Sequence, residues 1–194
     1  MSTHVSIIAG LGNPEERYAR TLHNAGFWIV DEIARRWNGR FAYEKRFDAD
    51  VCKVSIGDSD VWLVKPQSYM NLSGGPVRAV LDYYRLSVAQ LLVAHDEIDL
   101  PPGTVRLKNG GGHGGHNGLR DLIQHCSNDF MRMRIGVGHP GEKDKVTGYV
   151  LKRASGEVES TLQISVDEAV DSISVLVERG IKEAMKALHT KTDQ

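Results

Sequence analysis

The sequence predicts a single α/β domain in which a twisted, mixed and largely parallel β-sheet is flanked by helices. The main reason is that β-rich runs alternate with segments of helical periodicity along the chain. The 194 residues suit one domain with a sizeable core, and 41% hydrophobic and 25% charged residues are ordinary for a globular protein. No linker or internal repeat divides the chain, so we expect residues 1–194 to form one domain.

The first half of the chain supplies a strand, a helix, a hairpin and a second helix. Residues 5–10 form a short β-rich run that ends in glycine, and 25–37 place apolar residues at helical spacing. The runs 50–56 and 61–66 alternate around a Gly-Asp-Ser-Asp turn, which is typical of a hairpin. Residues 73–84 carry an apolar stripe and predict the second helix.

The second half continues the alternation and ends in a long helical pattern. The expected elements are strands at 91–95, 104–107 and 131–136 and a helix at 119–125. Apolar residues recur at helical spacing over 157–188, which predicts a long C-terminal amphipathic helix that breaks at Gly180 and resumes.

Composition restricts the compartment. The chain has no apolar run of 18 residues, so no membrane span is expected. The N-terminal residues lack a basic region followed by a long apolar run, so they do not predict a signal peptide. Cys52 and Cys126 lie far apart in apolar surroundings, which favours reduced core thiols and a cytoplasmic protein.

The charge is unevenly distributed along the chain. Residues 104–153 carry nine Lys and Arg against four Asp and Glu, a local balance of +5, although the net charge of the whole chain is −1. A basic section in a neutral protein suits a polyanionic partner bound at one face. Solvated lysines distributed by chance remain the alternative.

A glycine-rich segment lies inside this basic section. Six of the ten residues from 109 to 118 are glycine, and the others are Asn109, His113, His116 and Asn117. The segment fits a loop that approaches a ligand closely, with a flexible linker as the alternative. Because a helical pattern follows directly, we expect Asn117 to cap that helix.

Polar clusters follow several predicted strands. In α/β folds the carboxyl ends of parallel strands gather the ligand site, so these loops are expected to converge at one edge of the sheet. The side chains that they would bring there are Asn13, His23, Asn71, Asp96, His116 and Asn117.

This set of residues suits hydrolysis of an acyl bond, most plausibly an ester. His23 can serve as general base with Asp96 fixing its tautomer, and the asparagines offer amide donors to a developing oxyanion. The sequence has no Gly-x-Ser-x-Gly elbow and neither cysteine has a reactive setting, so water is the expected nucleophile. Each residue alone is more often structural.

Two other site types were weighed. His113 and His116, with His95 and Asp96, could form a zinc site, but their spacing is not that of the usual zinc ligands. Residues 10–14 suggest a dinucleotide loop that lacks its third glycine, and there is no P-loop. We therefore expect neither a metal nor a cofactor.

Five blocks in order give the chain a family resemblance. They are residues 8–14 with Tyr18 and 21–26, then 65–74, 95–100, 114–119 and 134–141. Together they resemble the bacterial peptidyl-tRNA hydrolase family, whereas the acidic tail matches only in helical character. The resemblance implies a monomeric, cytoplasmic, cofactor-free α/β enzyme that cleaves the ester between peptide and tRNA and recycles tRNA from aborted translation.

The resemblance also implies roles for individual residues. His23 would be the catalytic base, Asp96 its orienting carboxylate and Asn13 the oxyanion donor. The expected substrate-binding residues are Tyr18, Met70, Asn71, His116 and Asn117. The expected tRNA phosphate-binding residues are Lys108, Arg134 and Lys143, all within the basic section.

Two further hypotheses remain open at this point. One is a catalytically idle RNA-binding relative, since similar folds serve as intron-splicing cofactors in chloroplasts. The joint presence of His23, Asp96, Asn13 and Asn71 disfavours it, because a pure binder would not need them together. The other is a general carboxylesterase, which the basic section disfavours and which salt-dependent tRNA binding would separate.

Overall fold

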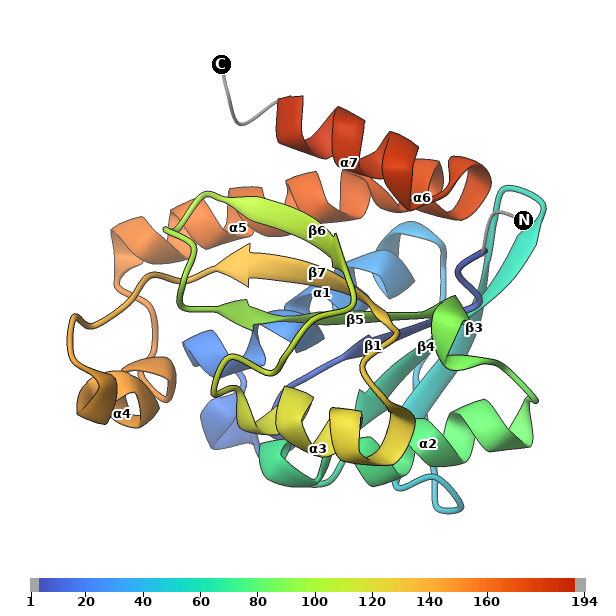
Figure 1. Ribbon diagram of the computed structural model, residues 1–194, viewed down its shortest axis with the longest axis horizontal. Coiled ribbons are helices and arrows are strands. Elements are labelled where there is room, and N and C mark those ends of the chain that lie inside the picture. Colours follow the sequence, from blue (N-terminus) through green and yellow to red (C-terminus); the bar gives the residue numbers. More distant parts are fainter. Residues whose placement is uncertain (1–3, 191–194) are drawn as a thin grey trace.

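A seven-stranded mixed sheet forms the centre of the computed structural model, which describes residues 4–190 (Figure 1). The strands lie in the order β2-β3-β4-β1-β5-β7-β6. Their bounds are β1 Ile7–Gly10, β2 Ala42–Glu44, β3 Ala49–Ile56, β4 Ser59–Pro66, β5 Leu91–Glu97, β6 Val105–Asn109 and β7 Met131–Gly136. The central strands β4, β1, β5 and β7 are parallel, and the pairs β2–β3, β3–β4 and β6–β7 are antiparallel. The predicted fold class is confirmed.

Helices cover both faces of the sheet. The α-helices are α1 Ala25–Arg36, α2 Gly74–Tyr83, α3 Asn117–Cys126, α4 Val146–Val150, α5 Gly156–Asp171, α6 Ile173–Arg179 and α7 Ile181–Thr190. Short 3₁₀ turns lie between them: η1 Glu16–Tyr18, η2 Leu22–Asn24, η3 Met70–Leu72, η4 Val88–Gln90 and η5 Lys143–Lys145. Helices α1 and α5–α7 lie on one face and α2 and α3 on the other (Figure 1). Neighbouring residues Ile7 and Ile8 are both fully buried, each in a different core, as expected for a strand covered on both faces.

The expected strands, hairpin and helices are present with small shifts at their ends. The C-terminal pattern differs more, because it breaks at Ser172 as well as at the predicted Gly180 and therefore forms three helices. The hydroxyl of Ser172 donates to the carbonyl of Ala169 at 2.6 Å, a local bond that competes with the helical backbone. Apolar spacing continues across this break, so periodicity could not reveal it.

Both cysteines are buried and unpaired, as the sequence predicts. Cys52 and Cys126 are free thiols, and burial raises the pKa of each to about 11. Among residues 4–190 no helix is both long enough and apolar enough to cross a membrane.

A glycine pair brings α1 against the sheet. A Cβ on Gly10 would lie 2.3 Å from the carbonyl oxygen of Gly26, and a Cβ on Gly26 would lie 2.3 Å from the carbonyl oxygen of Ala94. Only glycine at both positions permits this approach of the first turn of α1 to β1 and β5. The approach brings η2, which directly precedes α1, to the carboxyl end of β5.

Gly26→Ala is expected to destabilise the fold by about 1–3 kcal/mol, because the added methyl group meets backbone atoms that cannot rotate away. Urea unfolding measures the change in the free energy of unfolding. Gly148→Ala is the matched control, since a Cβ at this exposed position in α4 meets nothing within 4 Å. Equal stability of the two variants would contradict the role of the glycine pair.

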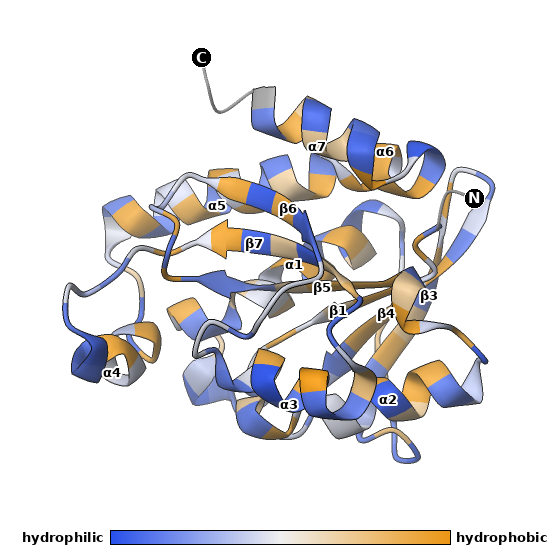
Figure 2. Ribbon diagram, in the orientation of Figure 1, coloured by the Kyte–Doolittle hydropathy of each residue, from blue (hydrophilic) through white to orange (hydrophobic). Residues whose placement is uncertain are grey.

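Strands β6 and β7 have one apolar and one basic face. Register places Arg106 opposite Arg134 and Lys108 opposite Arg132, and residues paired in this way share a face. We call these four residues the basic face. The alternating residues pack against the core under α5–α7, and orange and blue alternate along both strands in Figure 2.

Candidate active site

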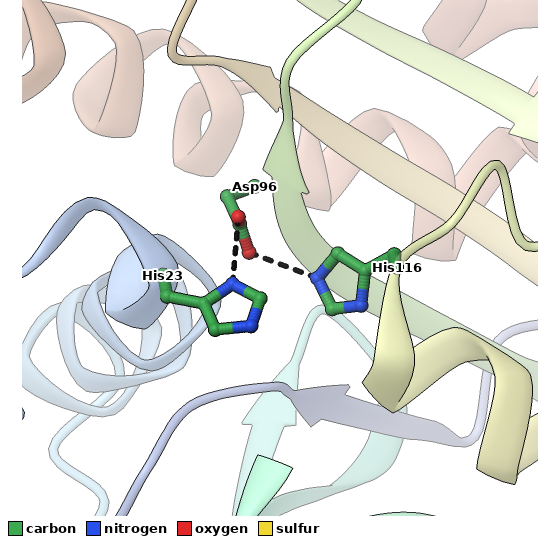
Figure 3. Close-up of side chains that lie close together, drawn as sticks. All are labelled: His23, Asp96 and His116. Carbon is green, nitrogen blue, oxygen red and sulfur yellow. Dashed lines mark hydrogen bonds and ion pairs between the residues drawn. The ribbon is translucent and has the colours of Figure 1, made fainter. Parts of the chain in front are cut away.

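A buried carboxylate lies between two histidines at the carboxyl end of β5 (Figure 3). Asp96 is 2% exposed, and its two oxygens are bonded to different imidazoles. His23 Nδ1 lies 2.8 Å from Oδ2, and His116 Nε2 lies 2.9 Å from Oδ1. His23 comes from η2 and His116 from the end of the glycine-rich loop, so three distant segments meet at one side chain.

The hydrogen bonds determine both tautomers. His116 Nδ1 accepts the backbone N–H of Leu119 at 3.3 Å, so the ring proton is on Nε2 and is donated to Asp96. His23 donates its Nδ1 proton to the other oxygen of Asp96. Its Nε2 therefore keeps a free lone pair, and no residue among 4–190 hydrogen-bonds to it. A histidine with this tautomer can accept a proton from water.

The charge of Asp96 controls the basicity of His23. Burial opposes protonation of His23, but the adjacent Asp96 charge and the hydrogen bond to it outweigh burial and raise the pKa of His23 above its ordinary value. Burial also opposes ionisation of Asp96, and its two histidine partners more than offset this, which holds the pKa of Asp96 well below its usual range. Asp96 is therefore a carboxylate at neutral pH.

The three ligand-type atoms of His23, Asp96 and His116 lie within 4.8 Å of one another. This differs from the zinc set considered from the sequence, because His113 instead accepts the N–H of Gly115 with its Nδ1 at 2.9 Å. Both imidazole nitrogens that face Asp96 carry protons, so neither offers a lone pair to a metal ion. The hydrogen-bond pattern suits proton transfer rather than metal ligation.

A third histidine packs behind this group. His95 is 1% exposed, donates its Nδ1 proton to the carbonyl of Asp96 and meets the ring of His116 edge-on at 5.3 Å. Burial, together with the neighbouring His116, lowers the pKa of His95 to about 3, so the ring is neutral at physiological pH. It supports the position of His116 without adding charge.

Asn13 presents an amide donor beside the histidines. Its Oδ1 accepts the backbone N–H of Met70 at 2.8 Å, so the opposite atom of the amide is the Nδ2 donor. Asn24 anchors the backbone of Asn13 with two bonds, accepting its N–H at 2.8 Å and donating to its carbonyl at 2.9 Å. Sequence reasoning missed Asn24, although it follows His23 directly in the block 21–26.

The other expected substrate-binding residues lie on η1, η3 and α3. Asn71 and Asn117 line one open pocket of about 260 Å³ together with three residues that were not anticipated, Arg120, Asp121 and Gln124. Met70 is buried, and its sulfur would lie 2.6 Å from a Cβ on Gly118, so it packs against the start of α3. Tyr18 is half-buried in η1, with the guanidinium of Arg17 4.7 Å from its ring centre.

The predicted helix cap is wrong by one residue. His116, not Asn117, caps α3 with its side chain, and Asn117 is the first helical residue and is exposed. The imidazole takes this role because its Nδ1 can accept from the helix while its Nε2 donates to Asp96.

The expected phosphate-binding residues are only partly brought together. Lys108 is exposed and Arg134 is half-buried on the basic face, where Arg134 also pairs with Glu97 at 3.7 Å. Lys143 is exposed in η5, and none of the described contacts joins it to this pair. Arg106 and Arg132 share the face and were missed, although their alternation with Lys108 and Arg134 is visible in the sequence.

The fold and this arrangement of an oriented imidazole, a buried carboxylate and amide donors define a hydrolytic enzyme of the α/β class. The chain belongs to the peptidyl-tRNA hydrolase family, whose model matches residues 7–194. A peptidyl-tRNA hydrolase of Halorhodospira halophila is 50% identical over 187 residues, which are 96% of each chain. One from Vibrio parahaemolyticus is 44% identical, with 98% of each chain covered.

A solved structure agrees with the sequence comparison. The crystal structure of peptidyl-tRNA hydrolase from Acinetobacter baumannii superposes with a TM-score of 0.94 at 41% identity. The match covers 97% of this chain and 96% of that chain. Hydrolysis of peptidyl-tRNA is thus the activity that the family and the fold support.

Proposed function

We propose that this enzyme hydrolyses the ester between peptide and tRNA by direct attack of a water molecule that His23 activates. The observation that carries the proposal is the tautomer of His23, whose Nδ1–H is bonded to Asp96 while Nε2 is free to accept a proton. Asn13, which the backbone of Met70 orients, and Asn71 and Asn117, which line one pocket, would supply neutral polar groups to the substrate.

The proposed reaction has two steps, attack of water and departure of the tRNA. Water gives a proton to His23 Nε2 as its oxygen bonds to the ester carbonyl carbon, and the carbonyl oxygen becomes an oxyanion that Nδ2 of Asn13 stabilises. The tetrahedral intermediate then breaks the bond to the ribose oxygen of tRNA. The His23 imidazolium returns its proton to that oxygen, which leaves a free peptide acid, a tRNA hydroxyl and neutral His23.

Asn71, Asn117, Tyr18, Met70 and His116 would contact the peptide end of the substrate. The pocket that Asn71 and Asn117 line is polar and open, which suits a peptide backbone held by amide groups. His116 would act mainly through Asp96, because both of its ring nitrogens are already engaged.

The basic face would hold the tRNA through its members other than Arg132, which is buried. Lys108 and Arg134 lie on it, and Lys143 would extend it from η5. Phosphate contacts carry no sequence information, which suits an enzyme that accepts many tRNAs. We further propose that the chain acts as one domain and as a monomer in the cytoplasm, without a cofactor, and that it recycles tRNA from aborted translation.

Release of peptide from peptidyl-tRNA by the purified protein, with a chelator present, tests substrate, reaction and metal independence together. Full turnover with chelator is expected. A protein that binds tRNA in a salt-dependent way without releasing peptide would be an RNA-binding relative instead. One that cleaves simple esters but ignores tRNA would be a general carboxylesterase.

Lys108→Ala and Arg134→Ala are each expected to raise KM for peptidyl-tRNA about tenfold and to reduce the salt dependence of binding by about one phosphate contact. A short peptidyl-nucleotide substrate should be cleaved as by the parent, because it does not reach the basic face. Steady-state kinetics on both substrates measure the difference. Lys53→Ala, an exposed lysine on β3, is the control, and equal effects on both substrates would refute the phosphate role.

A further inference from the structure

A buried arginine holds the glycine-rich loop from beneath. Arg132 is 2% exposed, and among the described residues no carboxylate forms an ion pair with it. Its two terminal nitrogens donate to the carbonyl oxygens of Gly111 and Gly112, and its Nε has no hydrogen-bond partner within residues 4–190. A buried charge is costly unless it is well satisfied, so an arginine devoted to two loop carbonyls calls for a reason beyond packing.

The loop that Arg132 holds leads to the catalytic carboxylate. Gly110, Gly111, Gly114 and Gly115 have positive φ angles of 70°, 114°, 57° and 84°, so the loop follows a path that residues with a side chain adopt only with strain. At its far end His116 donates to Asp96 and caps α3. Arg132 and the Asp96 contact fix the two ends of this segment, and between them the bonds are local ones, in which His113 accepts the N–H groups of Gly115 and His116.

The charges around Arg132 agree with this role. Burial lowers the pKa of Arg132, and the neighbouring Arg134 lowers it further, yet an arginine stays protonated at neutral pH. Its planar guanidinium directs two separate nitrogens at two successive carbonyls, a fixed fork that the single nitrogen of a lysine does not reproduce. The ring of Phe130 supports the guanidinium from one side at 4.6 Å.

We propose that Arg132 is a positioning residue for the hydrolytic reaction: by fixing Gly111 and Gly112 it sets the path of the loop so that His116 reaches Asp96. The inference rests on the proposed function, since it matters only if Asp96 orients the base. Arg132 touches neither water nor ester in this scheme. Its effect passes through His116, and this makes the proposal separable from a general role in stability.

A double-mutant cycle with His116 tests the proposal on the short peptidyl-nucleotide, which does not reach the basic face. Arg132→Met is expected to lower kcat at least tenfold in the parent, with KM changed less than about twofold. In a His116→Ala background the same change should lower kcat less than about twofold, because the contact through which Arg132 acts is already gone. Equal losses in both backgrounds would overturn the proposal.

Four further measurements complete the test. Arg132→Lys, which keeps the charge but loses the planar fork, should give a kcat between the parent and Arg132→Met, and it replaces the methionine variant if that one does not fold. The imidazole N–H resonance of His116 should move or broaden in either variant, and an unchanged resonance would count against the proposal. Met131→Leu, on the opposite face of β7, should keep parental kinetics. Hydrolysis of peptidyl-tRNA by the unmutated protein is measured separately. Its absence would contradict the proposed function, whereas equal losses in the double-mutant cycle would contradict only the positioning role of Arg132.

Discussion

His23→Ala is expected to lower kcat for peptidyl-tRNA by about 10²–10⁴-fold, the usual contribution of a general base, while tRNA affinity stays within about twofold of the parent. The reason is geometric. Both nitrogens of His116 and Nδ1 of His95 are engaged in hydrogen bonds. Nε2 of His95 is also without a partner, but that ring is 1% exposed, whereas the His23 side chain is 12% exposed and its free Nε2 can meet water. Single-turnover peptide release measures the first quantity and tRNA titration measures the second.

The matched control is His4→Ala, an exposed histidine before β1, which should retain parental kinetics. Loss of tRNA binding with normal turnover in His23→Ala would contradict the assignment of His23 as the general base. A loss of less than tenfold would mean that most of the rate acceleration comes from Asn13 and the other polar groups, and that His23 only orients the attacking water.

The sequence predicted the layout of the candidate site because the signal is local. Each polar cluster directly follows an expected strand, and parallel strands bring their carboxyl ends to the same edge. The structure joins Asp96 with His23 and His116, and Asn71 with Asn117. The rule explains Asp96 and Asn71, which follow parallel strands, but not His116 and Asn117: β6 is antiparallel to β7 and ends at the opposite edge, so the glycine-rich loop has to return to Asp96. The motif blocks pointed to the same residues before any geometry was known.

What the sequence could not show depends on contacts between distant segments. Asn24 reads as an ordinary turn residue until its amide is seen to hold both backbone groups of Asn13. Arg132 looks like one more cation of the basic section, and only the structure shows it buried against Gly111 and Gly112. The sequence favours Asn117 as the cap because asparagine is a common cap, and only the structure shows that His116, bonded to Asp96, takes that place.

Asp96→Asn is expected to lower kcat by about 10³–10⁴-fold through the tautomer of His23, because an amide presents one acceptor and one donor where the carboxylate presents two acceptors. His116 decides how the amide orients. The Leu119 N–H holds the His116 proton on Nε2, so the amide oxygen must face His116. The amide NH₂ then faces His23 Nδ1, which has to accept, and the His23 proton moves to Nε2. The nitrogen that should take a proton from water is thereby occupied.

The same substitution has a defined effect on pH dependence. In the parent the charge of Asp96 raises the pKa of His23 above its ordinary value of about 6.5, so activity should fall as pH drops through a value above 6.5. Without that charge the protonated form loses its stabilisation, and the acidic limb of the kcat profile should move to lower pH while the plateau falls. Because a protein that is merely destabilised would lose activity without this downward shift, the profile separates the two causes. A limb that stays in place, or parental turnover, would show that Asp96 does not control His23.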